Sequence, residues 1–130
     1  MSSTPMPEES NLAEKIKQVR RDPSQEHPPG FYEQVLDWLQ HSDAAVRREA
    51  LLFLGRHLRQ RSDAQVLLEM VAADPDPEVR RMAADCLGGV FRSTRHRHVN
   101  EVLAAAAKNT DEEGQVRAAA YAAIKRINGY

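Results

Sequence analysis

The sequence predicts an all-α protein built mainly from three similar helix pairs. Its 130 residues include only 5% aromatics, and Ala and Leu abound in the second half, which favours closely packed helices over a β-sheet. Apolar residues recur every three or four positions over most of the chain, as they do along one side of an α-helix. A run at residues 74–89 contains a turn, a helix start and a helix end, and weaker copies lie on both sides of it.

The run at residues 74–89 shows the pattern most clearly. Asp74 and Asp76 are each followed by proline, which cannot continue a helix, and a proline with an acidic residue then suits a first helical turn. Apolar residues follow at every fourth position: Val79, Ala83 and Leu87. This pattern predicts a helix over residues 76 to about 92, and its small alanines predict the close approach of a neighbouring helix.

The N-terminal part of the chain predicts a tail and a single helix. Residues 1–10 are rich in Ser, Pro and Glu, and we expect them to form a disordered tail. Asn11 is expected to cap a helix over residues 11–22. Its apolar residues share one narrow face: Leu12, Ile16 and Val19. We expect this helix to cover one end of the helix pairs, because the terminal apolar faces of a repeat array need a cover.

A single repeat domain is predicted over residues 11–130. Its helix pairs are expected at residues 31–60, 63–93 and 95–128. The first helix of the first pair is expected over residues 31–40, with Trp38 buried at the margin of its apolar stripe. Asp63 is expected to cap the first helix of the second pair. The third pair has a longer turn than the others, at residues 109–114.

The second helices of the three pairs can be aligned residue by residue, which is the strongest evidence for a repeat. Each begins with the same dipeptide: Val46-Arg47, Val79-Arg80 and Val116-Arg117. The same spacing aligns core positions: Ala50, Ala83 and Ala120, and then Leu54, Leu87 and Ile124. An acidic residue, Asp74 or Asp111, stands five positions before the valine in two pairs, and His41 takes that place in the first.

The run Asp-Pro-Asp-Pro-Glu-Val-Arg-Arg-x-Ala-Ala-x-x-Leu-Gly at residues 74–88 resembles the second half of a HEAT repeat. It is most similar to the short bacterial repeats also found in phycobilin-lyase-like proteins. The resemblance covers about residues 31–128. It implies a right-handed α-solenoid, the armadillo-like superhelix of stacked helix pairs, in which the second helices line the concave side.

The resemblance also implies a ladder of polar contacts between adjacent repeats. In this ladder an Asp before one second helix bonds to an Arg at the start of another. The matching positions here are Arg47, Asp74, Arg80, Asp111 and Arg117. His41 departs from the pattern and leaves the first contact of the ladder open. Such contacts have a physical reason, because the polar groups of stacked turns lose water and need partners.

The remaining face of the second helices is predicted to bind a partner, with a plain solvated surface as the equal alternative for any single arginine. Arginine suits binding because its planar fork contacts carboxylate or phosphate in two places. The predicted partner-binding residues are Arg48, Glu49, Leu52, Arg56, Arg59, Arg81, Met82, Asp85, Arg92 and Arg126. In the third pair the same face is expected to expose small residues, namely Ala118, Ala119 and Ala122.

No motif for catalysis or for a cofactor stands out, and we expect neither. The formal net charge is -1 with 28% charged residues, so no global excess of charge indicates a nucleic-acid or membrane partner. The single cysteine, Cys86, is interpreted as a small core residue rather than a nucleophile. His96 and His98 lie in a basic run that lacks supporting metal ligands, and this run is interpreted as a solvated loop.

The sequence therefore predicts a non-catalytic protein-protein interaction module, an adaptor, scaffold or inhibitor, that binds its partner on the concave face. We expect a monomer or weak oligomer that is cytoplasmic and has no membrane segment. Two alternatives stay open. One is a nucleic-acid-binding module, which requires the arginines of the concave face to form one uninterrupted patch. The other is an accessory subunit of a bilin lyase, by resemblance alone.

Overall fold

The computed structural model describes residues 12–21, 27 and 29–130 of the chain. The predicted tail and the Asn11 cap lie outside the described residues. The described part contains seven α-helices, one short 3-10 helix and no strand, which confirms the predicted all-α solenoid. The helices are α2 (Leu12–Arg21), α3 (Phe31–Trp38), α4 (Ala44–His57), η1 (Arg61–Ala64), α5 (Gln65–Ala73), α6 (Pro77–Val90), α7 (Arg97–Lys108) and α8 (Gly114–Ile127).

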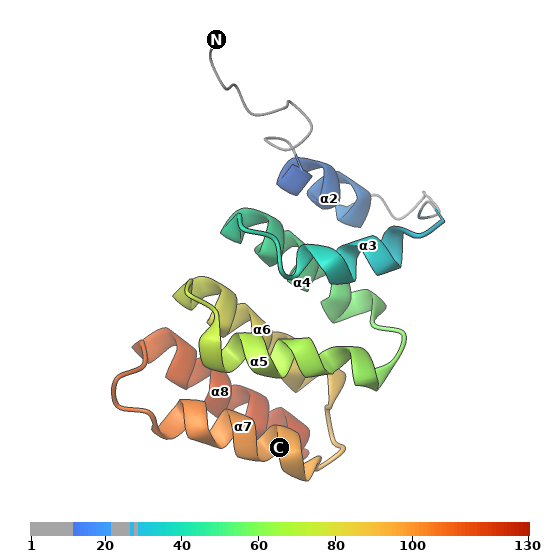
Figure 1. The fold of residues 1–130 in the computed structure, drawn as a ribbon. Helices are drawn as coiled ribbons and strands as arrows, with labels where there is room; N and C mark the ends of the chain where they lie inside the picture. The colour runs from blue at the N-terminus through green and yellow to red at the C-terminus, as the bar shows by residue number, and fades with distance from the viewer. Residues whose placement is uncertain (1–11, 22–26, 28) are drawn as a thin grey trace.

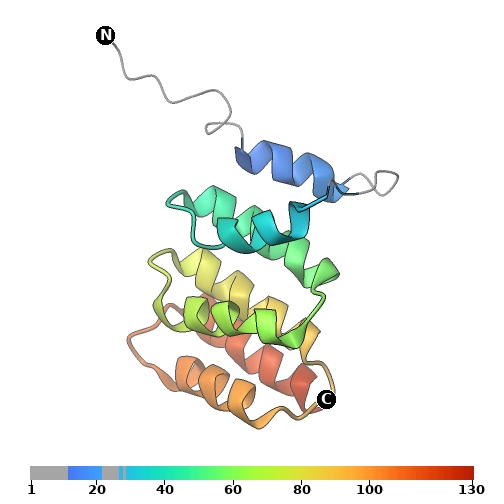
Figure 2. The same ribbon diagram turned by 45° about the vertical axis from the view of Figure 1, so that its right-hand side comes forward.

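The helices form a stack that runs from α2 at one end to α7 and α8 at the other (Figures 1 and 2). Three helix pairs lie one above another: α3 with α4, α5 with α6, and α7 with α8. Helix α2 packs against α4 at the end of the stack. The central helix α6 packs against α4, α5 and α8. A single apolar core runs through the stack and includes the aligned positions Ala50, Leu54, Val79, Ala83, Leu87 and Ala120.

Helix starts follow the turn chemistry of the sequence. Asp43 and Asp76 are the N-caps of α4 and α6, and each carboxylate accepts a hydrogen bond from the amide two residues on, at 2.9 Å and 3.0 Å. Pro77 occupies the first turn of α6, where its missing N–H costs nothing. His96 caps α7 by accepting from the amide of Val99 at 3.3 Å. This basic segment thus contributes a helix cap.

The predicted role of Asp63 as a helix cap is wrong. Asp63 lies inside η1, and its Oδ2 accepts a hydrogen bond from the hydroxyl of Tyr32 at 2.6 Å. That hydroxyl also accepts from the amide of Arg59 at 3.0 Å. Tyr32 is buried, so its hydroxyl needs polar partners, and this contact across 31 residues takes the carboxylate away from the local cap.

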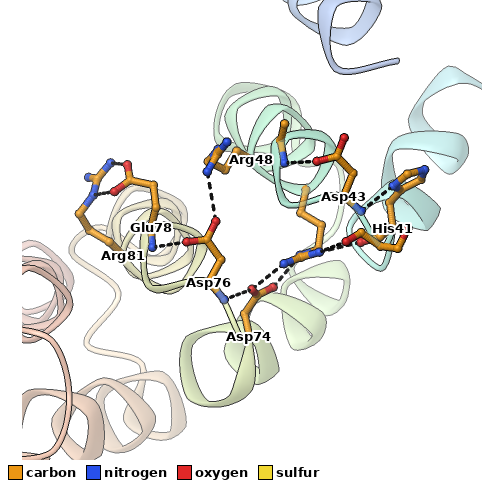
Figure 3. A network of polar contacts seen from close by, with 10 residues as sticks. His41, Asp43, Arg48, Asp74, Asp76, Glu78 and Arg81 are labelled. Atoms are coloured by element: carbon orange, nitrogen blue, oxygen red, sulfur yellow. Dashed lines mark hydrogen bonds and ion pairs between the residues drawn. The ribbon is translucent and has the colours of Figure 1, made fainter. Parts of the chain in front are cut away.

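The ladder contact between Arg47 and Asp74 joins α4 to the turn before α6. Arg47 donates from Nε to Oδ2 of Asp74 at 2.9 Å and from Nη2 to Oδ1 at 3.0 Å. Both residues are only 8% exposed. Asp74 Oδ1 also accepts from the amide of Asp76 at 2.9 Å, and Arg48 reaches the Asp76 carboxylate at 3.1 Å (Figure 3). One buried carboxylate therefore satisfies a guanidinium and a turn amide together.

The ladder contact of Arg80 uses a different acid from the predicted Asp111. Arg80 binds Glu112 in two places, at 2.9 Å and 2.8 Å, whereas Asp111 is exposed and its side chain makes no such contact. Three residues, 74–76, separate α5 from α6, but five, 109–113, separate α7 from α8. Because of the longer turn, Asp111 lies exposed to solvent and Glu112 lies beside Arg80. The assignment of Asp111 to the ladder is therefore corrected to Glu112.

The ends of the ladder use other partners. Arg117 donates to the carbonyl of Ala107 at 3.1 Å instead of to a carboxylate. At the other end, the backbone carbonyl of His41 accepts from Arg47 at 2.8 Å, so this position contributes without an acidic side chain. Arg20 of α2 pairs with Glu49 of α4 at 3.0 Å and joins the N-terminal helix to the stack.

Helices α6 and α8 approach each other closely at Gly88. A Cβ at Gly88 would lie 2.9 Å from both Cα and Cβ of Ala123, which is too short for carbon atoms. Gly55 stands at the equivalent position of α4, 33 residues earlier. A Cβ there would meet only the Sγ of Cys86, at an ordinary 3.9 Å. The two glycines are thus equivalent in sequence and different in packing.

We predict opposite effects for Gly88→Ala and Gly55→Ala. Gly88→Ala forces a backbone shift in the core and should lower the free energy of unfolding by about 1–3 kcal/mol. Gly55→Ala fits without a clash and removes a flexible residue from a helix interior, so it should raise that free energy by about 0.5–1 kcal/mol. Urea denaturation followed by circular dichroism measures both. Equal destabilisation by the two changes would contradict the described packing.

We also predict that Glu112→Gln destabilises the protein and Asp111→Asn does not. Loss of a charged hydrogen-bond partner costs about 1.5–3 kcal/mol, whereas a surface change stays within about 0.5 kcal/mol. The bonds from Arg80 hold the pKa of Glu112 below its ordinary value of 4.5. The folded state therefore holds the proton less tightly than the unfolded state, and the stabilisation is complete above pH 4.5 and is lost as the pH falls through the lowered pKa.

Chemical denaturation of the wild type and both variants at a series of pH values tests this prediction. The difference between wild type and Glu112→Gln should be largest near neutral pH and should shrink in acid. A larger loss of stability in Asp111→Asn than in Glu112→Gln at neutral pH would contradict the prediction and support the pairing of Arg80 with Asp111 that the sequence suggested.

Candidate functional site

The second helices α4, α6 and α8 together line a groove of about 320 Å³, which we call the central groove. Six of the residues predicted to bind a partner line it: Leu52, Arg56, Arg81, Met82, Asp85 and Arg126. The other lining residues are Leu51, Gly55, Cys86 and Gly89. The helices bring side chains separated by up to 75 positions in the sequence into one surface.

The floor of the central groove is apolar. Leu51 is 2% exposed and belongs to the core, while Leu52 is 40% exposed and presents its side chain to the solvent. Met82 and Cys86 are partly buried against the same core. Burial raises the pKa of the Cys86 thiol to about 12, so the thiol is protonated at neutral pH and is a poor nucleophile. Cys86 therefore serves this surface as a small apolar group.

One arginine of the central groove is already neutralised by its own helix. Arg81 binds Glu78 through two guanidinium nitrogens and Asp85 at 2.8 Å (Figure 3 shows the first pair). Burial raises the pKa of the Asp85 carboxyl, and the nearby guanidinium groups of Arg81 and Arg126 oppose that rise. This side of the groove consequently carries acids and bases in balance.

Arg56 and Arg126 differ from Arg81 because no carboxylate of the described residues lies within 4.0 Å of either guanidinium. Arg126 lies across the two glycines of α6. Its Nη2 is 3.3 Å from the place where a Cβ of Gly89 would stand, and its Nη1 is 3.5 Å from the carbonyl oxygen of Asp85. Both guanidiniums can therefore still donate hydrogen bonds to a ligand.

A second hollow of about 320 Å³ adjoins the central groove, and we call it the arginine hollow. Its lining residues are Gly55, Arg56, Leu58, Arg59, Arg61 and Val90. Arg59 lies over the ring of Tyr32 at 4.3 Å and is 3.5 Å from Glu33, and Arg61 lies 5.7 Å from the ring of Phe91. Sequence reasoning selected Arg59 but missed Arg61, which belongs to no aligned helix position.

Three predicted binding residues lie outside both hollows. Arg48 pairs with Asp76, and Glu49 pairs with Arg20, so each has a structural partner. Arg92 is exposed but lines neither hollow. The expectation that Ala119 is exposed is wrong, because it is 8% exposed and lies in the core. Sequence reasoning also missed Tyr121, which is 54% exposed.

Other candidate features have structural roles. Trp38 is partly buried and meets the ring of Phe31 edge-on, with ring centroids 5.7 Å apart. Among the described residues, no three metal-ligating side chains come together. Within the same part of the chain, no helix has the length and apolar composition needed to cross a bilayer.

The comparison with known families agrees with the repeat seen in the sequence and in the fold. The family model for HEAT repeats matches residues 16–88 and again residues 64–129, two overlapping stretches that together span most of the chain. Comparisons with curated proteins and with solved structures give no match. The narrower resemblance to phycobilin-lyase-like proteins thus gains no support. The stacked helix pairs and the two family matches show that this chain belongs to the HEAT-repeat family.

Proposed function

We propose that this protein is a non-catalytic protein-protein interaction module that binds a partner in the central groove. The observation that carries the proposal is the combination of apolar side chains, the exposed Leu52 and the partly buried Met82, with two guanidiniums that lack carboxylate partners among the described residues. A surface of this composition resembles the centre of protein interfaces, where apolar residues and arginine are enriched. HEAT repeats generally act by binding other proteins, which supports the same conclusion.

The packing of the groove favours tight recognition. Its residues project from three helices that are held together by a continuous core, so little backbone freedom is lost when a partner binds. An adaptor, a scaffold or an inhibitor can each work through such a surface.

A protein partner fits the charges better than nucleic acid does. Two of the arginines that a continuous basic patch requires are paired with acids: Arg48 with Asp76, and Arg81 with Glu78 and Asp85. These acids interrupt the patch and repel a long phosphate backbone. Protein surfaces carry charges of both signs and apolar groups, and they can match this mixture.

We predict that a photoreactive amino acid at position 52 captures a partner, and that the same amino acid at position 105 does not. Leu52 lies in the central groove, whereas Ala105 is exposed on the first helix of the third pair. The two variants should be expressed in the native host, irradiated, and compared by mass spectrometry of the adducts. A second variant with Met82→Glu should reduce the adduct at position 52, because it places a charge in the apolar part of the groove.

Equal helical circular dichroism of the variants provides the control for folding. A partner captured at position 105 and not at position 52 would move the binding surface to the first helices and overturn the proposal.

A further inference from the structure

The central groove and the arginine hollow adjoin each other, and we call the two together the channel. They share Gly55 and Arg56 on the last turns of α4. Gly55 has no side chain to separate them, and even an added Cβ would only touch the Sγ of Cys86 at 3.9 Å. An extended segment of a partner can therefore lie in both parts at once, along a path from Arg126 to Arg61.

The two parts of this channel differ in chemistry. The central groove offers Leu52, Met82 and the neutral Cys86 thiol beside Arg126, and the charge of Arg81 is balanced by acids of its own helix. The arginine hollow is instead lined by three arginines, Arg56, Arg59 and Arg61. One end of the channel thus favours an apolar side chain, and the other end favours negative charge.

The positive charge of the arginine hollow is not cancelled by its surroundings. The Arg59–Glu33 contact is 3.5 Å long, and the two side chains are 61% and 67% exposed, so solvent weakens this pair. Asp63 is bound to the hydroxyl of Tyr32. Three arginines against these two acids leave a formal charge of +1, and Arg56 and Arg61 have no carboxylate within 4.0 Å among the described residues.

Carboxylates suit these arginines geometrically. The planar guanidinium fork binds a carboxylate through two parallel hydrogen bonds, and this chain already uses that arrangement between Arg47 and Asp74 and between Arg80 and Glu112. A nucleic acid carries its charge evenly along its length and would meet Glu78 and Asp85 at the other end of the channel. A peptide can place its charge at one end only.

We propose that the channel recognises an acidic peptide segment of a partner protein, in which an apolar side chain is followed or preceded by carboxylates. The apolar side chain lies between Leu52 and Met82, and the carboxylates bind Arg56 and Arg61. Arg126 can donate to the backbone carbonyls of the segment. This inference rests on the proposed function, because it assigns a chemistry to the partner of the same groove.

Fluorescence anisotropy with a small set of labelled peptides tests the inference. Each probe carries one leucine and the triplet Glu-Asp-Glu, separated by zero to three glycines, in both orders. We expect at least one probe to bind the full chain at low ionic strength and to lose affinity as salt is added. Matched probes with Gln-Asn-Gln in place of the acids, or with serine in place of leucine, should each bind about tenfold more weakly or worse.

Variants of the protein locate the binding. Arg56→Gln and Arg61→Gln should each weaken the best probe by about tenfold or more, because each loses a charge-assisted bidentate contact. Arg97→Gln is the control, since Arg97 is an arginine on the exposed start of α7 whose side chain is 94% exposed. It should leave the affinity unchanged, and circular dichroism should show the same helical content in all three variants.

Failure of every probe to bind, or an equal loss in Arg97→Gln, overturns the inference. A single-stranded DNA oligonucleotide that binds more tightly than every peptide also overturns it and favours nucleic acid. Failure of this inference is distinguishable from failure of the proposed function. If position 52 still captures a partner while Arg56→Gln and Arg61→Gln leave that capture intact, the central groove binds a protein whose recognition does not depend on acids.

Discussion

The buried pair of Arg47 and Asp74 is the contact on which the relative placement of the repeats depends. The Asp74 carboxylate accepts hydrogen bonds from the Arg47 guanidinium and from the backbone amide of Asp76 at the same time. Arg47 also donates to the backbone carbonyls of His41 and Ser42. Two successive turns are thus connected by one pair of side chains. Removal of either partner would leave a desolvated charge, which makes such a pair costly to break.

The Arg80–Glu112 pair repeats this connection between the second and third units, and close packing completes it. Small residues allow α6 to approach its neighbours, and Gly88 allows a close approach to Ala123. At the equivalent positions of α8 stand Tyr121 and Lys125, where α6 has Ala84 and Gly88. The outer face of α8 is therefore not shaped for the same close contact, and the third unit differs chemically from the two before it.

The groove follows from this scaffold. Once the turns and the small residues set the spacing of α4, α6 and α8, side chains on their free faces converge, although they come from distant parts of the sequence. The acids in that face neutralise some arginines and leave others available. A rigid surface with separate apolar and cationic regions is suited to selecting partners, because a ligand must match both regions at once.

The sequence alone determined the all-α class, the number of helix pairs and the aligned core positions, because apolar periodicity and turn residues act locally and recur in three aligned copies. It also singled out Arg47 and Asp74, and six of the residues that line the central groove. Only the tertiary structure decided which acid binds Arg80. The turn before α8 is two residues longer than the turn before α6, and it places Glu112 instead of Asp111 beside this arginine. An alignment based on the following helix does not detect this shift. The tertiary structure also decided that Asp63 serves Tyr32 and that Arg61 joins Arg56 and Arg59, since contacts between distant residues depend on how the helices stack and how far each side chain reaches.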